Sequence, residues 1–100
     1  MTESIESDMV FAPVEGLELT DVPDGRVVYQ AAKERVHYFN PTAVVVFELC
    51  GMGHSVKEIE KFLMDAYDLE ASPAELVRAC IRSLLNEGLL RLSPRSSAAP

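Results

Sequence analysis

The side chains that could carry chemistry are few, and they stand far apart in the sequence. His37 and His54 are 17 positions apart, and no Cys or carboxylate stands at a metal-ligand interval from either. The chain also lacks a glycine-rich phosphate loop and the Gly-x-Ser-x-Gly pattern of a nucleophile elbow. Catalysis needs several polar groups that converge in one pocket, and no such set can be named here. The sequence favours binding over catalysis, and we expect neither a metal nor a cofactor.

Three features indicate a cytoplasmic protein. Cys50 and Cys80 are 30 positions apart in apolar helical patterns, which is typical of buried free thiols and not of a disulfide framework. No apolar run approaches the length of a membrane span. The first residues are acidic, where a secretory signal would be basic.

The net charge of −7 belongs to the first quarter of the chain. Residues 1–25 contain seven Asp and Glu and no Lys or Arg, whereas residues 26–100 contain nine acidic and nine basic residues. Nucleic-acid binding rests on neutralising phosphates, so this balance argues against a nucleic-acid partner. Arg78 and Arg82 could instead pair with the carboxylates of a short acidic peptide.

Three short strands are predicted between residues 17 and 39. Leu17–Thr20 alternates in polarity, Val22–Gly25 (VPDG) is typical of a tight turn, and Arg26–Gln30 is rich in β-branched and aromatic residues. Residues 34–39 alternate again, with an aromatic ring on each face, which leaves open whether His37 or Tyr38 faces a binding partner. Joined by short turns, these strands predict a small antiparallel sheet.

Three helices are predicted after the strands. Asn40 is a good N-cap and stands directly before a proline, so the first helix is expected to begin at Pro41. Ser55–Glu58 and Ser72–Glu75 both have the capping-box pattern, which predicts the start of the second and third helices, the third with proline at its first position. A short extended segment, residues 89–92, is expected to follow.

The order of these elements predicts an α+β fold, in which a small three-stranded antiparallel sheet is followed by three helices. Two helices with a short connection, a longer third helix and a small sheet beside them indicate a winged helix-turn-helix-like arrangement. The acidic start and the end rich in Ser, Pro and Ala stand outside this pattern. We expect a flexible N-terminus over residues 1–14, one domain over residues 15–92 and a disordered tail over residues 93–100.

Residues 37–67, HYFNPTAVVVFELCGMGHSVKEIEKFLMDAY, and the ending NEGLL of the third predicted helix resemble the PqqD-like family. These small peptide chaperones of ribosomal peptide modification are also called RiPP recognition elements. The resemblance covers roughly residues 15 to 90. The parts that match the family pattern are Phe39-Asn40, Pro41-Thr42-Ala43, Gly51 to Gly53, Ser55 to Glu58 and Gly88-Leu89-Leu90. Phe39 in place of Leu, and Cys-Gly-Met-Gly where an Asp-Gly turn is common, argue against the pyrroloquinoline quinone pathway member itself.

The resemblance implies a domain that captures the leader of a precursor peptide and presents it to a modifying enzyme, often a radical SAM protein. The leader would add as a strand to the edge of the third strand and lie in the groove between that strand and the third helix. The residues expected to bind it are Glu34, Arg35, Val36, His37, Tyr38, Phe39, Arg78, Ile81, Arg82 and Leu85. The two arginines could equally form a solvated face, and Ile81 and Leu85 could be plain core.

Two other functions fit the same fold. A winged-helix transcriptional regulator would read DNA with its third helix, and an adaptor would bind an enzyme without contacting a peptide. The zero net charge of residues 26–100 argues against DNA. An exposed edge strand invites pairing between copies, so a monomer and a homodimer both stay open. The expected partners are a leader peptide and its modifying enzyme, with no nucleic acid and no membrane.

Overall fold

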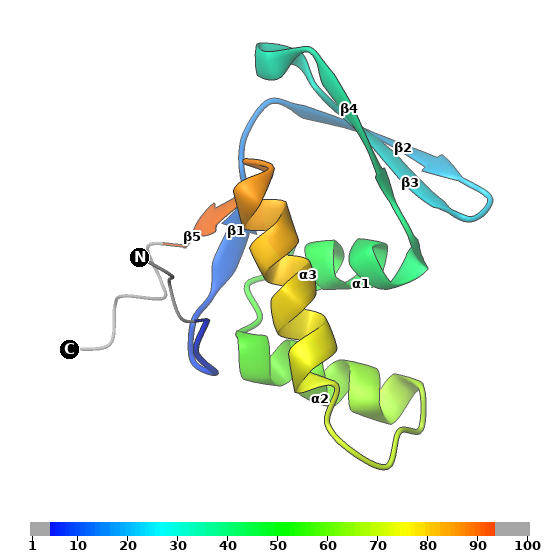
Figure 1. Ribbon diagram of the computed structural model, residues 1–100, viewed down its shortest axis with the longest axis vertical. Helices are drawn as coiled ribbons and strands as arrows, with labels where there is room; N and C mark the ends of the chain where they lie inside the picture. The colour runs from blue at the N-terminus through cyan, green and yellow to red at the C-terminus, as the bar shows by residue number, and fades with distance from the viewer. Residues whose placement is uncertain (1–4, 94–100) are drawn as a thin grey trace.

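Two antiparallel sheets and three helices form residues 5–93, the part of the chain that the computed structural model describes (Figure 1). The strands are β1 (Phe11–Pro13), β2 (Leu17–Val22), β3 (Gly25–Gln30), β4 (Arg35–Phe39) and β5 (Leu90–Leu92). The helices are α1 (Pro41–Gly51), α2 (Val56–Ala66) and α3 (Ala74–Asn86), and a 3-10 turn, η1 (Ala31–Lys33), precedes β4. The expected α+β class is confirmed, with a three-stranded antiparallel sheet beside three helices in a winged-helix-like arrangement.

The strands β2, β3 and β4 lie in chain order in the larger sheet. Pro23 and Asp24 form the two-residue turn between β2 and β3, which pairs Val22 with Gly25 and fixes the register of the hairpin. Gly25 has a φ of +156°, and a Cβ at this position would collide with the carbonyl oxygen of Phe39. Only glycine allows β4 to lie this close to the turn.

The caps predicted for the first two helices are confirmed. Asn40 Oδ1 accepts a hydrogen bond from the N–H of Ala43 at 2.8 Å, so α1 begins directly after β4. Ser55 and Glu58 form the reciprocal capping box, with the Ser55 N–H donating to the Glu58 carboxylate at 2.8 Å and the Glu58 N–H donating to the Ser55 hydroxyl at 3.2 Å. Polar side chains next to apolar segments thus determine where α1 and α2 start.

The capping box predicted for the third helix is wrong. Pro73 has a ψ of 44°, which is not helical, and it occupies the cap position, so α3 begins at Ala74. No side chain makes a cap hydrogen bond there. Ser72 lies one residue too far from the first turn for its hydroxyl to reach the unpaired N–H groups.

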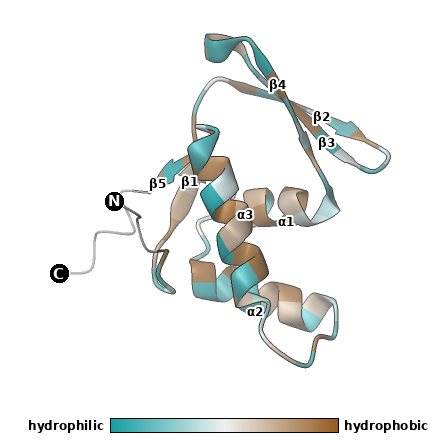
Figure 2. Ribbon diagram, in the orientation of Figure 1, coloured by the Kyte–Doolittle hydropathy of each residue, from teal (hydrophilic) through white to brown (hydrophobic). Residues whose placement is uncertain are grey.

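The helix α1 lies at the centre of the core. Figure 2 shows hydrophobic colour along most of its length, whereas α2 and α3 alternate between hydrophobic and hydrophilic residues. Val46, Phe47, Leu49 and Cys50 are buried, and Phe47 packs edge-to-face on Phe39 at the end of β4, with ring centroids 5.1 Å apart. Burial on several sides explains why the β-branched run of this segment is helical despite its low propensity. None of the helices among residues 5–93 is long and apolar enough to cross a membrane.

Residues 5–14 belong to the fold, which corrects the expectation of a flexible segment up to residue 14. Ile5 and Phe11 are buried in the core, and β1 pairs antiparallel with β5. The carbonyl oxygen of Met9 accepts from the N–H of Val56 at 2.9 Å, so this segment also holds the start of α2. The sequence pattern concealed β1 because the strand is short and its partner lies near the other end of the chain.

The extended segment predicted over residues 89–92 is confirmed as β5, which pairs with β1. Ser93 follows it, and its N–H donates to the carbonyl oxygen of Val10 at 2.8 Å. The rest of the two predicted tails, residues 1–4 and 94–100, lies outside the described residues.

Candidate functional site

The strand β4 is an edge of the larger sheet, and one row of its backbone groups faces away from β3. In an antiparallel pair, residues that exchange hydrogen bonds alternate with residues that do not. Counted from the Val22–Gly25 pair at the turn, His37 and Phe39 exchange hydrogen bonds with β3. Val36 and Tyr38 direct their N–H and C=O groups outward, so β4 offers a pairing site for a further strand.

A groove of about 530 Å³ runs between this open edge and α3. Figure 1 shows α3 crossing in front of α1, with β4 above it. On the β4 side the groove is lined by residues 37–40, and on the α3 side by Leu76, Ala79, Cys80, Ser83, Leu84 and Glu87. The middle of the α3 wall consists of small side chains, which leaves room for a side chain from another molecule.

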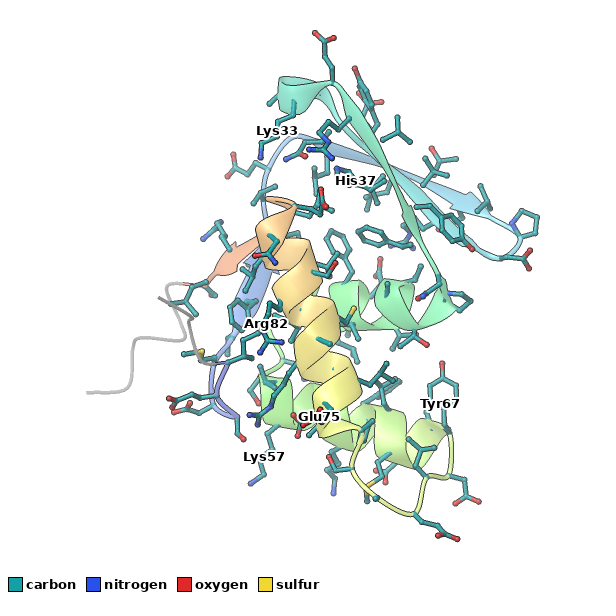
Figure 3. The ribbon with its side chains drawn as sticks, viewed as in Figure 1. Lys33, His37, Lys57, Tyr67, Glu75 and Arg82 are labelled. Atoms are coloured by element: carbon teal, nitrogen blue, oxygen red, sulfur yellow. The ribbon has the colours of Figure 1, made fainter. Side chains whose placement is uncertain are left out.

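His37 lies at the end of the groove next to the C-terminus of α3, on the helix side of the sheet (Figure 3). Its side chain is 10% exposed, its Nδ1 lies 3.8 Å from Glu87 Oε1, and its Nε2 lies 3.3 Å from Gln30 Oε1. Arg35 Nη2 lies 3.5 Å from the same Glu87 oxygen. Gln30 Nε2 also donates to the carbonyl oxygen of Gly88 at 3.2 Å. These contacts hold the sheet against the end of α3.

Val36 and Tyr38 point their side chains to the other face of the sheet, and they are 67% and 59% exposed. The Tyr38 hydroxyl donates to the carbonyl oxygen of Asp24 at 2.6 Å, so the ring lies toward the β2–β3 turn. Of the two rings that the alternation left open, His37 is the one that faces α3. Glu34, predicted to begin this strand, instead has a left-handed φ of 51° and ends η1.

Arg78 does not line the groove between β4 and α3, where the sequence analysis had placed it. Its Nε donates to Glu60 Oε2 at 3.2 Å, its Nη1 to the carbonyl oxygen of Ile5 and its Nη2 to Ser7 Oγ, both at 2.9 Å. The guanidinium joins α3, α2 and the N-terminal segment. Only 11% of the Glu60 side chain is exposed, so Arg78 neutralises a nearly buried carboxylate, and we assign it a structural role.

The other three residues predicted on the third helix also lie away from the groove lining. Arg82 lies on the same flank as Arg78, on the side of α3 away from β4 (Figure 3). Ile81 is fully buried, and Leu85 packs against the core. The alternative interpretation of Ile81 and Leu85 as core residues fits these positions.

The residues that α3 does bring to the groove form a regular stripe. Leu76, Cys80, Ser83 and Glu87 are spaced by four, three and four positions, which is the spacing of one helix face. This stripe is one border of the apolar face of α3, whereas Arg78 and Arg82 lie at the other border. The helical period identifies both borders, but it does not say which of them packs toward β4.

Cys80 brings a thiol to the groove, but its surroundings suppress its reactivity. Burial raises the pKa of Cys80, and burial raises that of Cys50 to about 12. Both cysteines are free, as expected from the sequence. A protonated thiol is a poor nucleophile. Among residues 5–93 no group of three or more His, Cys, Asp or Glu side chains gathers to hold a metal ion. The groove is better suited to hold a chain than to react with it.

No family model matches the chain, and no curated protein matches it. Its fold matches a solved structure. That structure is described as "Lasso peptide synthetase B1 complexed with the leader peptide". The TM-score is 0.71 at 19% sequence identity, and the match covers 81% of this chain and 96% of the other. At this identity the likeness establishes a shared fold, so the function must be argued from the groove of this chain itself.

Proposed function

We propose that this protein is a non-catalytic peptide chaperone that binds the leader of a ribosomally synthesised precursor and presents it to a modifying enzyme. The observation that carries the proposal is the open edge of β4 beside the groove against α3. Strand addition needs an unpaired edge and side-chain pockets next to it, and both are present. Support comes from lasso peptide synthetase B1, which has the same fold and is complexed with a leader peptide, and from the PqqD-like sequence pattern.

Backbone pairing supplies only the first part of the affinity. A guest strand would use the outward N–H and C=O groups of Val36 and Tyr38, about four hydrogen bonds of roughly 0.5–1.5 kcal/mol each. Their sum of roughly 2–6 kcal/mol is less than the about 8 kcal/mol of a micromolar complex. The guest also loses freedom on binding. Contacts between side chains in the groove must supply the remainder, and these contacts give specificity.

The groove favours apolar contacts over acidic ones. Every second side chain of a guest strand would point into the groove, toward the small Ala79 and Ser83. Leu76 is 54% exposed in the free protein, and covering it is favourable at roughly 25 cal/mol per Å². Among the described lining residues Glu87 is the only Asp or Glu, and none is Lys or Arg. We expect leader carboxylates to contribute little, in contrast to the role first predicted for the arginines of α3.

The chemistry would then belong to a partner enzyme. The described residues bring no set of converging catalytic groups to the groove, and burial raises the pKa of its one thiol, Cys80. A carrier that binds the leader leaves the remainder of the precursor free to reach another active site. A radical SAM protein is one such partner, and the class of enzyme is to be read from the genes beside this one.

The direct test follows backbone amide shifts while the leader of the neighbouring precursor is added to the isotope-labelled chain. Shifts are expected in Arg35–Phe39 and on the stripe of α3 that includes Cys80 and Ser83, with Arg82 unaffected. Shifts that spare β4 and this stripe would refute the groove as the leader site.

A second test replaces single amides of the leader by N-methyl amides. In strand addition only alternate guest N–H groups bond to β4, so methylation should weaken binding at every second position and have little effect between them. Each sensitive position should cost about tenfold in affinity, the value of one hydrogen bond and the steric conflict with the edge. A loss of affinity with no such alternation would exclude strand addition as the mode of binding.

A further inference from the structure

The sheet has a second open edge, on β2, which the proposed leader-binding role does not use. The alternation that places Val36 and Tyr38 outward on β4 also applies here. Leu17, Leu19 and Asp21 direct their N–H and C=O groups away from β3, and none of these groups has another backbone partner among the described residues. The edge of β2 is as free to pair as that of β4.

A second groove of about 350 Å³ lies beside this edge, between β2, β1 and the C-terminal half of α1. Leu19 and Met52 line it and are 47% and 68% exposed, although both are large and apolar. Natural proteins commonly protect a free edge with Lys or Pro, and β2 (LELTDV) contains neither. An open edge without Lys or Pro, beside exposed apolar side chains, is typical of a surface that another chain covers.

The charge around the edge of β2 is negative. Glu15 and Glu18 are exposed and form no ion pair among the described residues. Asp21 and Glu48 share one cation, Arg26, whose Nε lies 2.8 Å from Asp21 Oδ1 and whose Nη1 bonds to Glu48. The hydrogen bonds that Arg26 donates to Glu48 and, second, to Asp21 raise its pKa, so this cation is already engaged by two carboxylates. A basic segment would complement the remaining carboxylates.

We propose that the edge of β2 is a second strand-addition site, which accepts an extended segment of a partner protein with alternating aliphatic and basic residues. Its aliphatic side chains would lie against Leu19 and Met52, and its Lys or Arg side chains would face Glu18 on the other face of the sheet. A second copy of this chain is disfavoured, because pairing two β2 strands brings like charges together. The edges of β2 and β4 flank β3, so both can be occupied at once. This site is independent of the proposed leader site.

Two synthetic peptides of equal composition test this site. The peptide acetyl-KVKLKVK-amide alternates, whereas acetyl-KKVLVKK-amide has the same charge without the alternation. The first should shift the amides of Leu17, Leu19 and Asp21 and bind at least about tenfold tighter than the second, with an affinity that falls as salt is added. Equal affinity of the two peptides would mean that they bind by general charge attraction alone. Amide shifts confined to β4 would mean that the peptide binds at the other edge. Either result overturns the proposal.

Two variants locate the binding. Leu19→Pro removes one outward N–H and leaves the hydrogen bonds between β2 and β3 intact, so it should abolish the preference for the alternating peptide. Met52→Lys tests the same groove without a backbone change and should weaken the alternating peptide by about tenfold. Val36→Pro, on β4, should have no effect, and a loss there equal to that in Leu19→Pro would contradict the assignment. If the unmodified chain forms a dimer and Leu19→Pro dissociates it, the segment that pairs with β2 is a second copy of this chain. That result would overturn the proposal.

Discussion

The two free edges of one sheet offer the same backbone groups in different surroundings. The edge of β4 faces α3, with small side chains in the middle of the wall and His37 at one end. The edge of β2 faces the end of α1, with exposed Leu19 and Met52 and with carboxylates around them. Because main-chain groups are alike in every strand, selectivity for a guest must come from the helix and the charges beside each edge. Which guest strand an edge prefers is therefore set by the side chains beside it.

The largest expected effect is a loss of stability from a change at Gly25. This residue follows the turn between β2 and β3 and lies against β4, so the change acts on the strands of both edges. Gly25→Ala places a Cβ against the carbonyl oxygen of Phe39, so we expect a loss of roughly 3 kcal/mol in the free energy of unfolding. Gly16→Ala is the matched control, since Gly16 also has a positive φ of +83° but has nothing within 4 Å of the added Cβ. Its cost should be about 1–2 kcal/mol. Equal losses in urea denaturation would show that the close approach of β4 has no energetic weight.

The next effect separates stability from recognition on α3. Arg78→Ala leaves the nearly buried carboxylate of Glu60 without its partner and should lower the free energy of unfolding by about 2–3 kcal/mol. Arg82→Ala removes an exposed side chain and should change stability by less than about 0.5 kcal/mol. Neither variant should alter leader affinity when the chain is folded. If Arg82→Ala weakens the leader complex, as measured by fluorescence anisotropy, then Arg82 does contact an acidic residue of the leader.

Thiol modification distinguishes the two edges chemically. Burial raises the pKa of Cys80, so alkylation should be slow at neutral pH and should accelerate as rising pH forms the thiolate. Because Cys80 lines the groove beside β4, a saturating leader should slow its modification by about tenfold or more, whereas the alternating basic peptide should leave the rate unchanged. Intact-mass spectrometry over time gives both rates. Cys50 is buried and serves as the internal reference. Unchanged Cys80 modification under saturating leader would place the leader elsewhere.

The smallest effect tests the backbone contacts alone. Val36→Pro removes one outward N–H of β4, and we expect leader affinity to fall by about tenfold, near the upper value of a single hydrogen bond. Leu19→Pro is the matched change on β2 and should leave leader affinity unaltered. Isothermal titration of both variants, after circular dichroism has established their fold, measures the difference. Equal losses would mean that the leader does not discriminate between the edges.

Local sequence signals account for most of the elements. The Pro-Asp-Gly turn, the Asn40 cap and the Ser55–Glu58 box act within a few residues, so their outcome does not depend on the remainder of the chain. The capping box predicted at Ser72–Glu75 is wrong because Pro73, and not Ser72, occupies the cap position of α3. The strand β1 escaped detection because its pairing with β5 joins segments near opposite ends of the domain. Such contacts leave no local pattern.

The candidate site was predicted on one side and misplaced on the other. The edge strand was located from its alternation, and only its first residue, Glu34, proved to lie outside it. The helix side was assigned to Arg78 and Arg82 as partners for acidic residues and to Ile81 and Leu85 as an apolar contact, but none of the four lines the groove. The structure instead turns Leu76, Ser83 and Glu87 toward β4. These residues are one apolar, one small and one acidic side chain, and no motif in the sequence marks such a set as a binding surface.

What the sequence determined by itself is the three strands of the larger sheet, with β4 as an open edge, and the three helices, but not β1. Hydrophobic period, turn residues and caps are local, and the alternation along a hairpin decides which backbone groups remain unpaired. Only the tertiary structure decided what lies beside each edge. The rotation of α3 about its axis depends on how Val77, Ile81 and Leu84 pack into a core shared with α1 and β4. That packing energy is a sum over distant partners, so the border of α3 that meets β4 is fixed by the whole fold.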